Sequence, residues 1–204
     1  MKTKLKILLM LLTFIVASCK SDKNNKSNSN IESIIKEAKV LGNEEEYALL
    51  FEELLAKKAL SIEQLLEAFP KKLGNLEIDS GQTEMGNSDS TVSGSVIKGS
   101  FGNNAIKMVI TDCGGNNAGL AIMNIKGYDL LHLESDDNTK YLKKERNGIK
   151  TSGIYTVANN QSELKFVFDK RFYVTLEAEG MTVDELWGIL NVNTSLKRFK
   201  EFNN

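Results

Sequence analysis

The spacing of apolar residues changes along the chain, and each change predicts a different kind of structure. Between residues 31 and 78 apolar side chains recur every three or four positions, which predicts amphipathic helices. The clearest stripe consists of Tyr47, Leu50, Phe51, Leu54 and Leu55. A shorter helix is expected over residues 62–69, because Ser61 and Gln64 form a capping box and Pro70 ends the helix. We therefore expect a helical segment over residues 31–78.

A polar stretch over residues 79–90 separates this helical segment from a region with a different period. Its Gly, Ser, Asn, Asp and Thr residues predict a loop or linker. From residue 91 onward polar and apolar residues alternate, which predicts strands. The expected strands span 91–101, 105–111, 139–146, 149–157, 163–169 and 171–179. Asn147-Gly148 predicts a tight type I′ turn, and such short connections make neighbouring strands antiparallel.

Two segments complete the predicted architecture. Residues 120–133 fit either a helix or a strand, because Gly127 weakens an otherwise helical pattern. A final helix is expected to open at Thr182, and a further helical turn is expected over residues 195–202. The predicted fold class is α+β, with N-terminal helices, an antiparallel sheet of about five or six strands, and a C-terminal helix packed on the sheet. We expect residues 31–204 to form one globular domain, in which residues 91–204 supply the sheet and the C-terminal helices. The helices are expected to pack on one face of the sheet.

The N-terminus has the pattern of an export signal. Lys2, Lys4 and Lys6 precede the apolar run 7–16, and ten helical residues rise about 15 Å, half of a membrane core of about 30 Å. The run is therefore a signal-peptide core and too short for a membrane span. Residues 20–30 contain no apolar side chain, so we expect a flexible tether.

The run ends in Val16-Ala17-Ser18-Cys19, which resembles the lipobox of bacterial lipoproteins. The resemblance implies that residues 1–18 are a signal peptide cleaved between Ser18 and Cys19, and that Cys19 carries fatty acyl chains such as palmitate. Residues 19–30 are then the lipidated cysteine and its tether, and the membrane is a partner through this lipid. Lys20 after the cysteine favours the outer membrane of the cell envelope, on its periplasmic or surface face.

A second resemblance lies near the C-terminus. Residues 170–174 and 180–186 are similar to the corresponding part of small cell-envelope lipoproteins of unassigned function. The similarity covers about a quarter of the chain and implies no activity.

Composition excludes several functional classes. The 204 residues include 26 basic and 27 acidic ones, for a net charge of -1, and loss of residues 1–18 would leave 23 basic against 27 acidic. This balance argues against nucleic acid as a partner. No glycine-rich phosphate loop is present in the sequence, so we expect no nucleotide and no other cofactor.

Chemistry-bearing side chains are few. With Cys19 lipidated, Cys113 is the remaining thiol, His132 is the single histidine, and Asp112 stands beside the thiol. These three residues are the candidates for a cysteine-dependent site. One histidine and one thiol cannot complete a zinc set, so no metal is expected. Tyr141 and Tyr155 could pair across the predicted turn and form a binding face.

We therefore expect a protein without enzymatic activity. The leading hypothesis is a lipid-anchored module that binds a protein partner or supports an assembly in the envelope. One alternative is an immunity or inhibitor lipoprotein that blocks a periplasmic enzyme through an acidic patch over residues 44–53. The other is an enzyme that depends on Cys113.

Overall fold

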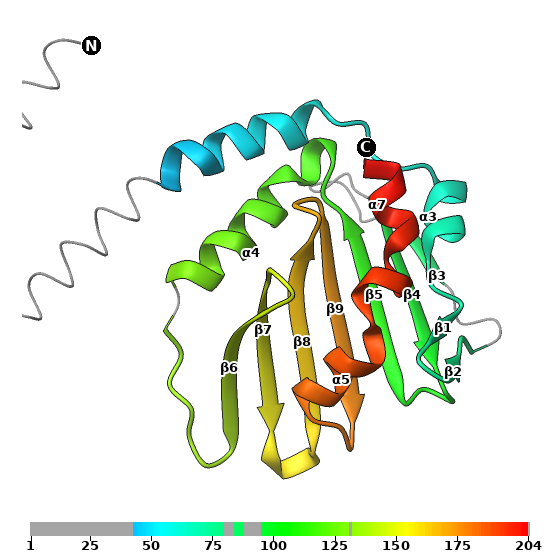
Figure 1. Ribbon diagram of the computed structural model, residues 1–204, viewed down its shortest axis with the longest axis vertical. Helices are drawn as coiled ribbons and strands as arrows, with labels where there is room; N and C mark the ends of the chain where they lie inside the picture. Colours follow the sequence, from blue (N-terminus) through cyan, green and yellow to red (C-terminus); the bar gives the residue numbers. More distant parts are fainter. Residues whose placement is uncertain (1–42, 80–83, 88–94, 131, 204) are drawn as a thin grey trace, which may run out of the picture. The chain divides into compact units, whose positions relative to one another are not determined.

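The computed structural model describes residues 43–79, 84–87, 95–130 and 132–203. The chain divides after Glu44, and the second unit, Glu45–Asn204, holds a large antiparallel sheet with its helices (Figure 1). The α+β class is confirmed. The predicted signal peptide, lipidated cysteine, tether and start of the domain at residue 31 lie outside the described residues.

The sheet has seven strands in the order β3-β4-β5-β9-β8-β7-β6, and every neighbouring pair is antiparallel. Six of them coincide with predicted strands within one or two residues where both ends are described. The seventh, β3, lies inside the predicted linker 79–90, where no strand was expected. Its residues do not alternate between apolar and polar, so the sequence pattern does not indicate a strand. The strand forms because it pairs with β4. The strands are β3 (Glu84–Asn87), β4 (Ser95–Phe101), β5 (Ile106–Asp112), β6 (Thr139–Arg146), β7 (Ile149–Thr156), β8 (Gln161–Phe168) and β9 (Phe172–Glu179).

The helices also follow local signals in the sequence. Ser61 caps α3 and Thr182 caps α5, each in a capping box with the residue three positions later. After Pro70 the chain forms a small hairpin, β1 (Lys72–Leu73) with β2 (Leu76–Glu77), so the helical segment predicted to residue 78 ends earlier. A first helix spans residues 43–56. The others are α3 (Ile62–Ala68), α4 (Ala118–Leu130), α5 (Val183–Leu190), α6 (Val192–Ser195) and α7 (Lys197–Asn203), with 3-10 turns η2 (Gly115–Asn117) and η3 (Val157–Asn159).

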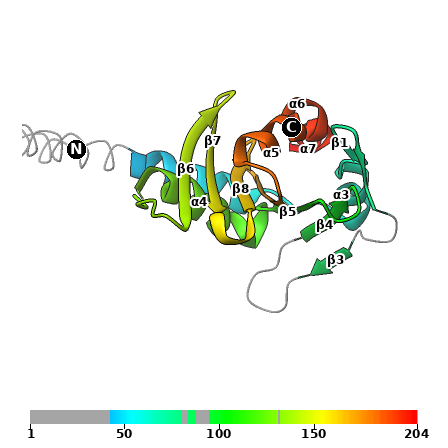
Figure 2. The ribbon, with the colours of Figure 1, turned by 90° about the horizontal axis from the view of Figure 1, so that it is seen from below.

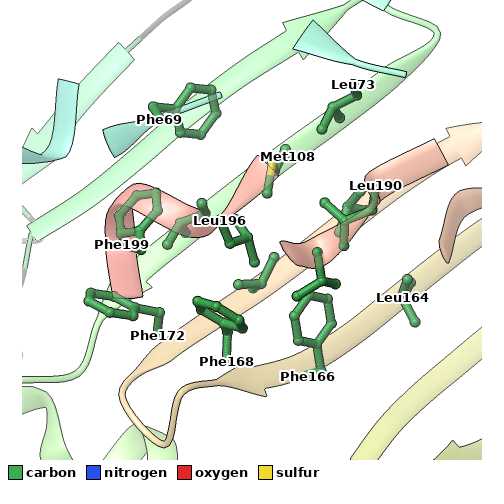
Figure 3. Close-up of a cluster of buried hydrophobic side chains, with 14 of the residues drawn as sticks. Phe69, Leu73, Met108, Leu164, Phe166, Phe168, Phe172, Leu190, Leu196 and Phe199 are labelled. Atoms are coloured by element: carbon green, nitrogen blue, oxygen red, sulfur yellow. The ribbon is translucent and has the colours of Figure 1, made fainter. Parts of the chain in front are cut away.

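One face of the sheet carries the main core. Alternate residues of β5, β8 and β9 point into it, and α3, α5, α6 and α7 cover it. Phe166 and Phe172 each meet an aromatic ring of these helices, at centroid distances of 5.5 Å to Trp187 and 5.0 Å to Phe199. Figure 3 shows this cluster between the strands and the C-terminal helices. Burial of these apolar side chains contributes roughly 1.5–3 kcal/mol for each large one.

The opposite face carries helices as well, so the expectation of helices on one face only was wrong. The helix over residues 43–56 and α4 lie on the side away from α5 (Figure 2). A smaller core of Leu54, Cys113, Ala118 and Ala121 forms there, and Val167 and Tyr173 pack against it. Because β8 and β9 present apolar residues at these positions on both faces, the sheet needs cover on both sides.

The ambiguous segment 120–133 is helical as far as Leu130. Small residues at Ala118 and Ala121 let α4 approach the sheet closely, and both are fully buried. The expected stripe on the first helix is only partly buried, since Tyr47 and Leu54 are covered whereas Phe51 and Leu55 are exposed. None of the described helices is long and apolar enough to cross a membrane.

Candidate functional site

Cys113 lies in the small core under α4 and has no access to solvent. Burial raises the pKa of its thiol to about 12. Its Sγ donates to the main-chain oxygen of Thr111 at 3.6 Å. A nucleophilic cysteine needs a thiolate and access to substrate, and this thiol has neither.

Asp112 belongs to a buried ion pair. Its carboxylate accepts two hydrogen bonds from Arg171, Nε to Oδ1 at 2.6 Å and Nη2 to Oδ2 at 2.9 Å. The main-chain N–H groups of Leu60 and Gly114 also donate to it, at 2.7 and 2.9 Å. Arg171 in turn donates to the main-chain oxygen of Lys58 at 2.9 Å. These contacts attach the segment between the first helix and α3 to β5 and give Asp112 a structural role. The sequence offered no signal for this pair, because its partners are 59 positions apart.

His132 follows the C-terminal end of α4 and is exposed. Cys113 and Asp112 precede the N-terminal end of the same helix, whose 13 residues rise about 20 Å. The three candidate residues therefore form no common site. In the described part of the chain, no group of three or more His, Cys, Asp or Glu side chains could hold a metal ion.

A different site lies between two hairpins of the sheet. The strands of β6–β7 and of β8–β9 stay paired up to their turns, but pairing between β7 and β8 ends at Thr151↔Phe166. The turn of the β6–β7 hairpin curves toward the side of the sheet that carries α5 (Figure 2). A cleft of about 780 Å³ opens there, with residues 147–150 on one wall and residues 166–170 on the other. We call it the hairpin cleft.

Two clusters hold the β6–β7 hairpin in this position. Toward α5, the buried Arg146 donates to the hydroxyl of Thr151 and to the carboxylate of Asp184. Toward α4, Lys150 and Tyr47 donate to Asp129 at 2.6 and 2.7 Å. The cleft walls are therefore fixed from both sides by side chains of different helices.

These contacts change the acidity of the two carboxyl groups. A hydrogen bond from Arg146, then one from Lys144, lowers the pKa of Asp184. Partial burial alone raises the pKa of Asp129, but hydrogen bonds from Lys150 and Tyr47 outweigh it and lower that pKa. Both groups are thus ionised at neutral pH and keep the hairpin attached.

The lining of the hairpin cleft combines apolar, aromatic and basic side chains. Tyr128 and Tyr141 lie on its α4 side, where Lys143 and Lys150 approach the Tyr128 ring at 5.3 and 5.6 Å. Tyr155 lies on the other sheet face, since Tyr141 opposes Ile154 and Tyr155 opposes Lys140. The expected pairing of the two tyrosines was therefore wrong. Five lysines and three acidic residues line the cleft: Lys143, Lys150, Lys165, Lys170, Lys200, Glu46, Glu163 and Asp169.

A second hollow is smaller and almost entirely apolar. It lies between the first helix and α4 and is lined by Phe51, Gly119, Ile122, Met123, Lys126, Gly127 and Leu130. Met123 is 63% exposed and Leu130 47% exposed. Its apolar lining offers few groups that could orient a ligand, so the hairpin cleft is the better candidate site.

Comparison of the chain with protein-family models, with curated proteins and with solved structures finds no match. The interpretation of the cleft therefore depends on its own geometry and chemistry. Sequence reasoning located the turn Asn147-Gly148 but missed the cleft. The available signal was the density of lysines over 140–150 and 165–170, next to the predicted turns.

Proposed function

We propose that this protein is a lipid-anchored module of the bacterial cell envelope that binds a protein partner in the hairpin cleft and has no enzymatic activity. The anchor is Cys19, and the outer membrane is the expected membrane. The observation that carries the binding role is the cleft itself. Its volume of about 780 Å³ falls in the range of ligand sites, roughly 300–1,000 Å³.

The lining of the cleft supports binding over catalysis. The tyrosine rings and the methylene chains of the lysines supply apolar surface, and the hydroxyl and ammonium groups at their ends can form hydrogen bonds. Such a combination suits recognition of another protein. Of the sequence candidates for catalysis, Cys113 and Asp112 are buried elsewhere, and His132 is the one that lines the cleft. Catalysis needs several reactive groups close together, and these three are not.

Photo-crosslinking from the hairpin tests the binding role. The photoreactive residue p-benzoyl-phenylalanine replaces Tyr141, inside the cleft, or Tyr155, on the other face of the same hairpin. In cells that make the protein naturally, we expect Tyr141 to give a discrete crosslinked protein and Tyr155 to give none. Equal products from both positions, or none from Tyr141, would contradict binding in the cleft.

Metabolic labelling tests the anchor separately. We expect radiolabelled palmitate to enter the wild-type protein and to be lost in Cys19→Ser, with the wild type in the outer-membrane fraction. Labelling that persists in Cys19→Ser, or an unlabelled wild type, would refute the lipid assignment and leave the cleft experiment valid.

A further inference from the structure

The hairpin cleft contains two free strand edges, and these point to the kind of partner. Continued pairing of β7 with β8 beyond Thr151↔Phe166 would bring Lys150 opposite Val167 and Ile149 opposite Phe168, but the strands separate there. On their outer sides the same residues remain in the β6–β7 and β8–β9 ladders. In an antiparallel strand, every second residue directs its main-chain N–H and C=O toward the same neighbouring strand. Where β7 and β8 separate, these groups face the cleft. The cleft walls therefore offer main-chain donors and acceptors.

An extended peptide satisfies such edges better than a small molecule or a helix. It carries a donor and an acceptor at every second residue on each side, and it supplies side chains alternately to the two faces. On one face of the cleft these side chains would meet Tyr128 and Val167, and on the other Ile149 and Phe168. Both faces contain apolar surface, so alternate residues of the peptide can be buried.

The charge at one end of the cleft indicates an acidic peptide. Lys170 lies in the β8–β9 turn and Lys200 on α7, and both are exposed cleft residues. Among the described residues, neither has a salt-bridge partner, whereas Lys150 pairs with Asp129 and Lys165 with Glu163.

Hydrogen bonds between α7 and the β8–β9 turn hold the segments that carry these two lysines. The side chain of Asn203 on α7 donates to the main-chain oxygen and to the carboxylate of Asp169, at 3.0 and 2.8 Å. Lys200 precedes Asn203 by three residues and so lies on the same side of α7. Lys170 adopts a positive φ of 58°, which residues other than glycine rarely do outside such turns. Both lysines thus line the cleft beside Asp169, whose carboxylate is already bound by Asn203.

We infer that the hairpin cleft binds an extended peptide segment between β7 and β8, with an acidic group of that peptide at Lys170 and Lys200. This inference rests on the proposed binding function and names its ligand. The expected partner is an extended, acidic strand or tail of another envelope protein. The chain as a whole carries a net negative charge, which would repel an acidic peptide from most of the surface. The basic end of the cleft is therefore the place where such a peptide would bind.

A random twelve-residue peptide library displayed on phage provides the probe. It is selected on the full mature chain made without lipid, residues 20–204, and enriched peptides are measured by fluorescence anisotropy. We expect enrichment of peptides with acidic residues, and affinity that falls as salt rises. Lys170→Gln with Lys200→Gln should weaken binding about tenfold or more, since both charges contact the ligand. The matched control, Lys98→Gln with Lys107→Gln, removes two exposed lysines outside the cleft and should leave affinity unchanged.

Main-chain pairing needs its own readout. N-methylation of central peptide bonds in an enriched peptide should abolish binding, and methylation at its ends should not, because only central N–H groups reach the strand edges. Circular dichroism of each variant verifies that the chain remains folded.

Three results would overturn the inference. They are the absence of enriched peptides, enrichment of peptides that bind equally well to the lysine double variant, and binding that tolerates central N-methylation. In each case a specific crosslink from Tyr141 would still support a protein partner in the cleft, so the two proposals fail separately.

Discussion

Replacing Asp112 with Asn should destabilise the protein strongly, although the change is small in volume. Asp112 has no exposed surface, and the side chain of Arg171 is 4% exposed. In Asp112→Asn an NH2 group replaces one carboxylate oxygen. This group is a hydrogen-bond donor, and it would face the guanidinium and main-chain N–H donors that now bind the carboxylate. The variant therefore leaves a buried positive charge without its counter-ion, which costs about 3–5 kcal/mol.

The size of this effect is measurable by urea unfolding. Trp187 is the single tryptophan and packs on Phe166, so its fluorescence reports loss of the main core. At about 2–4 °C for each kcal/mol in a chain of this size, the melting temperature should fall by about 6–20 °C. The m-value should not change if both proteins unfold in two states.

Two further variants separate the ion pair from other causes. Asp136→Asn makes the same chemical change on an exposed loop, where Asn also accepts from the main-chain N–H groups of residues 138 and 139, so it should cost less than about 0.5 kcal/mol. Asp112→Asn combined with Arg171→Met should cost less than the sum of the single changes, because the unpaired charge is gone. A loss below about 1 kcal/mol in Asp112→Asn, or strictly additive effects, would refute this reasoning.

Other predictions concern packing, thiol access and pH. Gly153→Ala should cost about 1–3 kcal/mol, because an added Cβ would lie 2.6 Å from Cγ1 of Val183. In contrast, Gly188→Ala in α5 meets no atom within 4 Å and should stabilise by about 0.5–1 kcal/mol; equal urea midpoints would contradict both. Cys113 should resist iodoacetamide in the native protein and react once urea unfolds it, as mass spectrometry can show; rapid labelling of native protein would refute its burial. The pKa values of Asp129 and Asp184 are lowered by folding, so their stabilisation is complete above about pH 4 and is lost as pH falls further. The urea midpoint should therefore decline on acidification, and it should decline less in Asp129→Asn with Asp184→Asn; an identical decline would exclude these two groups.

Much of the fold follows from local signals. The Asn147-Gly148 turn has φ values of 53° and 76°, as a type I′ turn requires, and it fixes the register of β6 and β7. Capping residues likewise placed the starts of α3 and α5. These features depend on a few adjacent residues, so the sequence alone indicates them.

The candidate site could not be predicted in the same way. The hairpin cleft lies where β7 is not yet paired with β8, before Thr151, and the hairpin is held there by a contact of Arg146 with Asp184, 38 positions away. Helices on both sheet faces could not be predicted either, because the sequence places Val167 between Lys165 and Asp169, a pattern typical of a solvent-exposed strand face, whereas Val167 packs against the small core under α4. Long-range contacts decide such features, and no short pattern records them.

The buried Asp112–Arg171 pair also constrains the order of events during synthesis. Its hydrogen bonds reach back to Lys58 and Leu60, and Arg171 also donates to Asn203 near the end of the chain at 3.4 Å. The contact of Arg171 with Lys58 can therefore form only after the ribosome has synthesised the chain through Arg171. Until then the Asp112 carboxylate can bind the main-chain N–H of Leu60 but lacks its counter-ion, and contacts so distant in sequence form slowly. The segment that precedes α3 consequently completes its attachment to the sheet only after β8 has been made.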